Sequence, residues 1–221
     1  MPFLVYLGIP QYYVLATYKL QMLLGHLTSV LNFSLKGSLP LRKGVALGVV
    51  FIVLGTALGT LFTLYLTPEI LRIIIPILMC GVFVYTLLAP KVGEEDTKPK
   101  IKPILFYTFV IFILGFYDGF FGPGASSLLI FAFVALLGLN MKKAVVRAKI
   151  MGFISNIVSL VISAGGGHVL WSIGLLMSVG QIIGAWAGSN LVLTKKVKFI
   201  RVVFLCVVGV TILKLILGLL H

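Results

Sequence analysis

The chain has 221 residues, of which 60% are hydrophobic and 10% charged, and its mean hydropathy is +1.19. Soluble domains run nearer about 45–50% apolar and 25% charged residues, so this composition excludes an ordinary soluble protein and predicts an all-α integral membrane protein. The net charge of +13 comes from 18 Lys and Arg against five acidic residues. Most of these cations lie in short loops between apolar segments, which indicates membrane orientation rather than nucleic-acid binding.

The apolar segments predict six full transmembrane helices, because a crossing needs about 20 residues. The predicted spans are residues 12–35, 44–66, 70–89, 141–164, 169–193 and 199–220. Residues 90–103 mix both charge signs with prolines, as is typical of a surface linker. Cys80 and Cys206 lie inside apolar spans without metal-ligand spacing, so we expect both to be buried.

Residues 115–127 read Gly-Phe-Tyr-Asp-Gly-Phe-Phe-Gly-Pro-Gly-Ala-Ser-Ser and lie in the middle of an apolar run. We expect the glycines and Pro123 to break a helix there, and broken backbone at membrane depth must be buried in protein or line a cavity. Residues 104–138 are too long for one crossing and short of the roughly 40 residues that two would take. They predict a re-entrant hairpin with arms 104–116 and 126–138. The alternative is a packing kink in which Asp118 caps a helix.

The placement of the cations favours the hairpin. If residues 104–138 return to the side they left, every loop cation except Arg72 shares one face, whereas a full crossing would divide the cations seven to seven. The positive-inside bias therefore predicts that segments 90–102 and 141–143 are cytoplasmic and that both termini face outward.

The two halves of the chain match one another at an offset of 130 residues. The matched pairs are Phe3/Phe133, Leu7/Leu137, Gly8/Gly138, Lys19/Lys149, Ser29/Ser159, Gly37/Gly167 and Gly44/Gly174. Three spans on each side of a turning hairpin predict two inverted repeats, residues 1–89 and 104–221, joined by the cytoplasmic linker 90–103. The counterpart of the hairpin's start would precede residue 1. Either the chain start is set too late, which we favour, or only one glycine-rich tip is kept.

The glycine-rich stretch resembles the motif of the TauE/SafE sulfite exporter family, also called toluene sulfonate uptake permeases. Lys149, Ser155 and Asn156 stand where that family has a lysine and a Ser-Asn pair. The resemblance covers residues 3–220 and implies transport of sulfite, organosulfonates or related sulfur-containing anions across the cell membrane. Two features depart from the family pattern: the first-half glycine motif is absent, and Ala125 replaces a common glycine.

The candidate substrate-binding residues surround the predicted break. Backbone amides at a broken helix point a positive dipole end toward a cavity, hydroxyls add donors, and a lysine inside a span either snorkels or faces the interior. The predicted anion-binding residues are Gly119, Gly122, Gly124, Ser126, Ser127, Lys149, Asn156 and Lys19.

A carboxylate repels an anionic substrate, so Asp118 is not included among the anion-binding residues. It has three alternative roles. It can pair with Lys19 or Lys149, cap the second arm of the hairpin, or carry a proton that couples transport. His26 is a candidate titrating group, and a packing or hydrogen-bonding role is the favoured interpretation.

Together these patterns predict a secondary transporter of small anions in the plasma membrane. A passive anion channel and a membrane assembly protein without transport activity are the alternatives. No enzyme is expected, because the sequence has no paired carboxylates, metal-ligand cluster or nucleophile with a base, and no cofactor is expected either. The expected partners are a small anionic substrate, the lipid bilayer and a second copy of the chain, without nucleic acid.

Overall fold

A computed structural model describes residues 11–37, 45–63, 93 and 95–200, with residues 202, 203, 206 and 210. These parts of the chain form helices and loops without a β-strand. The helices are α2 (Gln11–Leu35), α3 (Val45–Thr63), α5 (Pro103–Leu105), the π-helix η1 (Phe106–Val110), α6 (Ile111–Phe120), α7 (Ala125–Ala135), α8 (Met141–Gly165) and α9 (Trp171–Thr194). The predicted third span, and all but a few residues of the sixth, lie outside the described residues.

Four helical segments of the described chain are long and apolar enough to cross a membrane. They are Val45–Thr63, Pro103–Phe120, Met141–Gly165 and Trp171–Thr194. The α2 helix, which the sequence predicts as the first span, is not among the four although it has 25 residues, or about 37 Å of helix. It carries Lys19, Gln21, His26 and Asn32, which lower its hydropathy.

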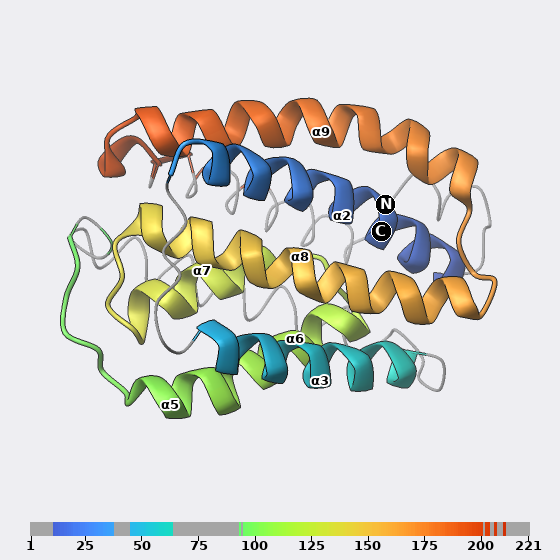
Figure 1. Cartoon of the computed structure of the whole chain (residues 1–221), viewed down its shortest axis with the longest axis horizontal. Coiled ribbons are helices and arrows are strands. Elements are labelled where there is room, and N and C mark those ends of the chain that lie inside the picture. Colours follow the sequence, from blue (N-terminus) through green and yellow to red (C-terminus); the bar gives the residue numbers. More distant parts are fainter. Residues whose placement is uncertain are drawn as a thin grey trace.

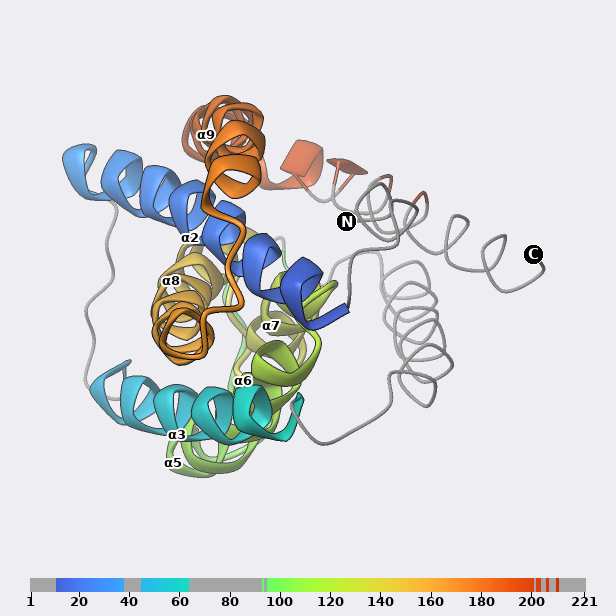
Figure 2. The same cartoon turned by 90° about the vertical axis from the view of Figure 1, so that its right-hand side faces the viewer.

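The α8 helix occupies the centre of the described bundle. It packs against α2, α3, α6 and α7, while α9 packs along the outer side of α2 (Figures 1 and 2). Figure 1 shows α2 and α8 running in opposite directions along the long axis. Large apolar side chains remain exposed on the outside of the bundle, including Leu54 and Leu58 of α3 and Leu176 and Ile183 of α9. An apolar exterior of this kind suits contact with lipid.

Glycines bring α3 and α6 into backbone contact. A Cβ added at Gly59 would lie 2.1 Å from the Phe116 carbonyl oxygen, and one added at Gly119 would lie 2.3 Å from that of Thr56. Gly115 and Gly119 both lie inside the intact α6 helix. The expectation that these two glycines help to break the helix is therefore wrong. They allow the two backbones to approach, as small residues do between membrane helices.

The helix break is confined to residues 121–124. Gly122 and Gly124 have φ values of 88° and 83°, a region in which glycine is unstrained. The two arms are consequently unequal, which corrects the predicted arms 104–116 and 126–138. Residues Pro103–Phe120 form one helical run of about 27 Å, whereas α7 has 11 residues, or about 16 Å.

The two ends of this hairpin lie side by side. The Thr97 amide donates to the Gly138 carbonyl at 2.7 Å, and the Lys100 amide donates to the Leu136 carbonyl at 2.9 Å. Residues before the first arm are thus hydrogen-bonded to residues after the second, and the chain between them folds back on itself.

Asp96 fixes the start of α8. Its carboxylate accepts from the Asn140 amide at 2.8 Å and from the Lys143 ammonium, while the Asn140 side chain caps the helix through the Lys143 amide at 3.0 Å. Desolvation raises the pKa of Asp96, but these two donors outweigh it and hold the pKa below its ordinary value. Asp96 is therefore ionised at neutral pH and stays bound to both donors.

Cys206 is exposed, which corrects the expectation that both cysteines are buried. The described residues Val202 and Val210 are exposed as well. Cys80 lies outside the described residues.

Candidate functional site

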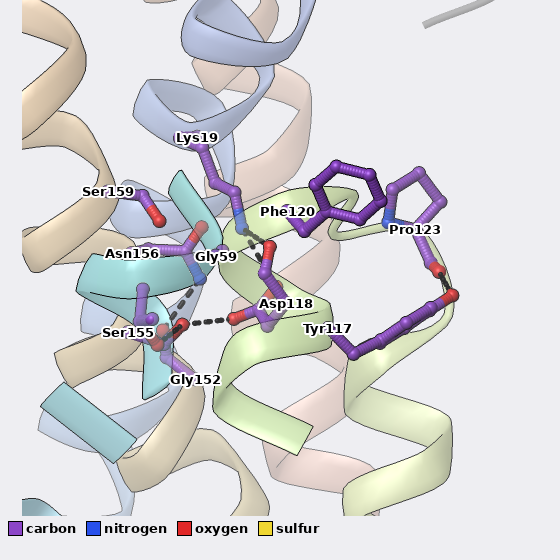
Figure 3. Close-up of polar contacts among 12 residues, drawn as sticks. Lys19, Gly59, Tyr117, Asp118, Phe120, Pro123, Gly152, Ser155, Asn156 and Ser159 are labelled. Atoms are coloured by element: carbon purple, nitrogen blue, oxygen red, sulfur yellow. Dashed lines mark hydrogen bonds and ion pairs between the residues drawn. The ribbon is translucent and has the colours of Figure 1, made fainter. Parts of the chain in front are cut away.

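A buried ion pair joins α2 to the hairpin. The Lys19 Nζ lies 2.9 Å from Asp118 Oδ1, and both side chains are more than nine-tenths buried (Figure 3). The same ammonium also donates to the Asp118 backbone carbonyl. This confirms the alternative in which Asp118 pairs with a lysine and identifies Lys19 as that lysine. Burying such a pair is favourable only when hydrogen bonds satisfy its remaining lone pairs and protons.

Asp118 does not cap α7. The N-cap of α7 is Gly124, which has no side-chain cap, and Asp118 lies inside α6 on the other side of the break. The capping interpretation is therefore wrong. The second carboxylate oxygen of Asp118 instead accepts from the Ser155 hydroxyl of α8.

Hydroxyl groups of α3 and α8 form two hydrogen-bonded pairs next to the ion pair. Thr56 Oγ1 lies 2.9 Å from Ser155 Oγ and donates to the Gly115 carbonyl at 3.2 Å. One helical turn further along each helix, Thr60 Oγ1 lies 2.9 Å from Ser159 Oγ and donates to the Gly119 carbonyl at 3.3 Å. All four hydroxyl side chains are buried.

Thr56 and Thr60 were not predicted from the sequence as site residues. Their signal is the spacing of four residues, which places two hydroxyls on the same face of an apolar helix. Ser155 and Ser159 of α8 have the same spacing.

Two backbone carbonyls of the turn at residues 121–124 accept hydrogen bonds from amides at the start of α7. The Ala125 amide donates to the Gly122 carbonyl at 3.1 Å, and the Ser127 amide donates to the Gly124 carbonyl at 2.9 Å. The Tyr117 hydroxyl of α6 donates to the Pro123 carbonyl at 2.6 Å and so links α6 to the turn (Figure 3). Gly122 faces the ion pair, since a Cβ built on it would lie 3.1 Å from Lys19 Nζ.

His26 and Asn156 meet where α2 crosses α8. Asn156 Nδ2 lies 3.2 Å from His26 Nδ1 and donates to the Gly152 carbonyl at 2.6 Å, while His26 Nε2 lies 3.3 Å from Ser126 Oγ. These contacts confirm the hydrogen-bonding role favoured for His26. With the Asn156 amide nitrogen turned toward His26 and the Gly152 carbonyl, Asn156 Oδ1 remains buried without a partner among the described residues.

Lys149 stands apart from the ion pair. It is half-buried, and within the described chain it has no hydrogen bond or ion pair. The remaining predicted residues divide into two groups: Ser126 reaches the site through His26, whereas the half-buried Ser127 contributes only backbone contacts to the α7 turn.

A cavity of about 50 Å³ opens beside the ion pair. Its polar lining comes from Lys19 of α2, Thr60 and Thr63 of α3, and Ser159 and Ser163 of α8, with His168 and Gly166 beyond the end of α8; Gly119 of α6 also borders it. The volume has room for a few water molecules or a small ion. The described residues contain no group of three side chains spaced to hold a metal ion.

A bundle with an apolar exterior and a buried ionic and hydroxyl-rich interior defines a multi-pass membrane protein with an internal polar site. Residues 1–215 match the family model described as Sulfite exporter TauE/SafE, and the chain belongs to that family.

Relatives share most of the chain's length. A "Probable membrane transporter protein" of Haemophilus influenzae is 40% identical over 201 residues, covering 91% of this chain and 78% of the relative. The "Probable membrane transporter protein YfcA" of Escherichia coli K12 is 38% identical over 215 residues, covering 97% and 80%. The "Probable membrane transporter protein ORF9" of Sinorhizobium is 33% identical over 201 residues, covering 91% and 77%. No solved structure gives a significant match.

Proposed function

We propose that this protein is a secondary transporter that moves small oxyanions, of the sulfite or organosulfonate kind, across the plasma membrane. The observation that carries the proposal is the pair of interior lysines. Lys19 is buried beside a cavity, and Lys149 has no counter-ion among the described residues. Lys149 is half-buried, and a cation inside a membrane bundle without a counter-ion is costly, so a bound anion relieves that cost.

Inverted repeats supply the usual construction of such a carrier. Helices α2 (Gln11–Leu35) and α8 (Met141–Gly165) have the same length, and their bounds differ by the same 130 residues as the sequence match. Their opposite directions in Figure 1 support an inverted relation. Residues His26 and Asn156, which meet at the crossing, are themselves 130 positions apart.

The hairpin is proposed to be re-entrant. Its two ends are hydrogen-bonded to one another, and an α7 of about 16 Å reaches only halfway through a hydrocarbon core of about 30 Å. The start of α8, which contains Lys143, and the end of α9, which Lys195 follows, lie at the end of the bundle where the hairpin starts (Figure 1). Lys98 lies in the segment that leads into the hairpin. The positive-inside bias then makes this end cytoplasmic and the start of α2 outward.

Uptake into vesicles tests the proposal. The purified protein is reconstituted into liposomes, and entry of labelled sulfite and of methanesulfonate is followed with and without an imposed gradient. We expect saturable uptake, and accumulation against the anion's own gradient distinguishes a carrier from a passive channel. Uptake no faster than in protein-free liposomes for every sulfur oxyanion tested would overturn the proposal.

Lys149→Met tests the residue that carries the argument. We expect it to lose most uptake, whereas Lys149→Arg keeps a measurable part because it retains the charge. Lys195→Met, which removes an exposed cation at the end of α9, is the matched control and should transport normally. Equal uptake by Lys149→Met and the unsubstituted protein would remove Lys149 from the site.

A further inference from the structure

The ammonium of Lys19 has three protons to donate, and Asp118 takes two of them. One goes to the Asp118 carboxylate at 2.9 Å and one to the Asp118 backbone carbonyl. Lys19 also lines the cavity between α2, α3 and α8. One donor therefore remains for a ligand in this cavity, but the positive charge behind it is already neutralised by the carboxylate.

The hydroxyl groups next to Asp118 can hydrogen-bond to it in its ionised form and in its protonated form. Ser155 has a single hydroxyl proton but two acceptors, Asp118 Oδ2 and Thr56 Oγ1. When Asp118 is ionised, Ser155 donates to the carboxylate and Thr56 donates to Ser155, while the Gly115 carbonyl keeps its backbone donor within α6. When Asp118 is protonated, the acid donates to Ser155, Ser155 donates to Thr56, and Thr56 donates to the Gly115 carbonyl at 3.2 Å. In this second arrangement the Ser155 and Thr56 hydroxyls each donate one hydrogen bond and accept one.

The other titratable groups near Asp118 do not supply a competing charge. Tyr18 of α2 and Tyr117 of α6 interact electrostatically with Asp118, and tyrosine phenols are neutral at physiological pH. The Ser155 hydroxyl of α8 contacts Asp118 directly, and the Thr56 hydroxyl of α3 is linked to it through Ser155. Lys149 and His26 interact with one another at the neighbouring crossing of α2 and α8. The buried Arg147 is hydrogen-bonded to Tyr107, and His168 borders the cavity. Asp118 is thus the acid that sets the net charge beside Lys19.

We propose that the cavity bordered by Lys19, Thr60, Ser159 and Ser163 binds a singly charged oxyanion, and that this binding requires a proton on Asp118. The inference rests on the proposed transport function. In the empty state the positive Lys19 and negative Asp118 sum to zero. In the loaded state the positive Lys19, the neutral acid and the bound monoanion also sum to zero. The pair formed by Lys19 and Asp118 therefore never carries an uncompensated charge, which would be costly in the bundle interior.

The same balance of charge predicts selectivity. A dianion such as fully ionised sulfite would leave one negative charge in excess, whereas hydrogen sulfite or an alkylsulfonate would not. The site is expected to prefer the monoanion, and each anion bound brings one proton with it.

Methanesulfonate is the probe that tests this inference, because it is a monoanion throughout the pH range used and any pH dependence belongs to the protein. Binding to the purified full-length protein is measured by calorimetry between pH 7 and 8.5 in two buffers of different ionisation enthalpy. We expect about one proton taken up per anion, and a dissociation constant that therefore rises about tenfold per pH unit. Binding with no proton uptake and a flat pH profile would overturn the inference.

Two variants sharpen the result. Asp118→Asn imitates the neutral acid, so it should bind methanesulfonate with the same affinity at every pH, and methanesulfonate should raise its melting temperature. Glu95→Gln removes an exposed carboxylate and should keep the pH dependence of the unsubstituted protein. If Asp118→Asn does not fold, the two-buffer measurement on the unsubstituted protein decides alone.

The outcomes separate the two proposals. Uptake of methanesulfonate into proteoliposomes without accompanying proton entry leaves the transporter in place and removes the proton requirement. Absence of both binding and uptake at every pH removes the transporter and this inference together.

Discussion

Lys19 of α2 and Asp118 of α6 form an ion pair with their charged atoms 2.9 Å apart, although 99 residues separate them in the sequence. The contact ties the first described helix to the hairpin. It also places the only acid that the structure describes in the bundle interior against a buried base.

Breaking one side of this pair is expected to destabilise the protein. Lys19→Met leaves the Asp118 carboxylate buried without its counter-ion, and such losses cost about 3–5 kcal/mol. The double variant Lys19→Met with Asp118→Asn should recover much of that stability, because no charge remains buried. Thermal unfolding in detergent measures both variants. A double variant no more stable than Lys19→Met would mean that the pair is not the source of the effect.

The contact between α3 and α6 gives a second prediction. Gly119→Ala places a Cβ about where the Thr56 carbonyl oxygen lies, at 2.3 Å, and backbone cannot yield as a flexible side chain does. We expect lower thermal stability by about 1–3 kcal/mol, as for overpacked cores. Gly184→Ala on α9 is the control, since no described atom lies within 4 Å of its Cβ position. Equal stability of the two variants would contradict the close approach.

The helical class, the approximate bounds of α2, α3, α8 and α9 and the region of the break could be predicted from sequence, because they follow from apolar run length and from glycine and proline. What the sequence left open was how each glycine acts. Gly119 and Gly122 are three residues apart in the same motif, yet one lies inside a helix against α3 and the other turns the chain at positive φ. The difference depends on which atoms of α3 lie against each glycine, and the sequence of the motif itself does not contain that information.

The site was predicted in part for a similar reason. Sequence singled out Asp118, Lys19, Lys149 and Asn156, since polar residues are rare inside apolar runs. It could not choose between Lys19 and Lys149 as the partner of Asp118, because that choice depends on how α2 and α8 pack around the hairpin. Thr56 and Thr60 were overlooked because threonine is unremarkable in a membrane helix until its neighbours are known.

The turn between α6 and α7 gives a third prediction. Gly122→Ala forces a side chain into the left-handed region, at a cost of about 1–2 kcal/mol, and puts a methyl group 3.1 Å from Lys19 Nζ. Gly37→Ala imposes similar backbone strain at φ 63° with no described neighbour within 4 Å. Both variants should lose comparable stability, but only Gly122→Ala should weaken anion uptake. Equal uptake by the two would separate the turn from the site.

The side-by-side ends of the hairpin give a fourth prediction, about topology. Single cysteines are introduced in a chain whose Cys80 and Cys206 have been replaced by serine, and an impermeant thiol reagent is applied to intact cells. Lys98→Cys and Lys195→Cys should be protected, because both lie at the proposed cytoplasmic end. Gly165→Cys, at the far end of α8, should be labelled (Figure 1). Labelling of Lys98→Cys and Lys195→Cys from opposite sides would contradict the arrangement.

The crossing of α2 and α8 gives the last prediction, from two glycines whose added Cβ atoms would be about equally crowded. At Gly25 the nearest atom is Gln181 Cγ at 2.6 Å, and at Gly152 it is His26 Cε1 at 2.7 Å.

The two neighbours differ in their freedom to move. Gln181 has only long contacts, 3.4 Å to the Gln21 amide nitrogen and 3.6 Å to the Met22 sulfur, so it can adopt another rotamer. His26 is buried and held on both ring nitrogens, by Asn156 and Ser126. Gly25→Ala should therefore be nearly neutral, helped by the better helix propensity of alanine, whereas Gly152→Ala should cost about 1–3 kcal/mol and reduce anion uptake. Unfolding midpoints and uptake rates of the two variants check this, and a Gly152→Ala protein as stable and active as Gly25→Ala would show that His26 is free to move.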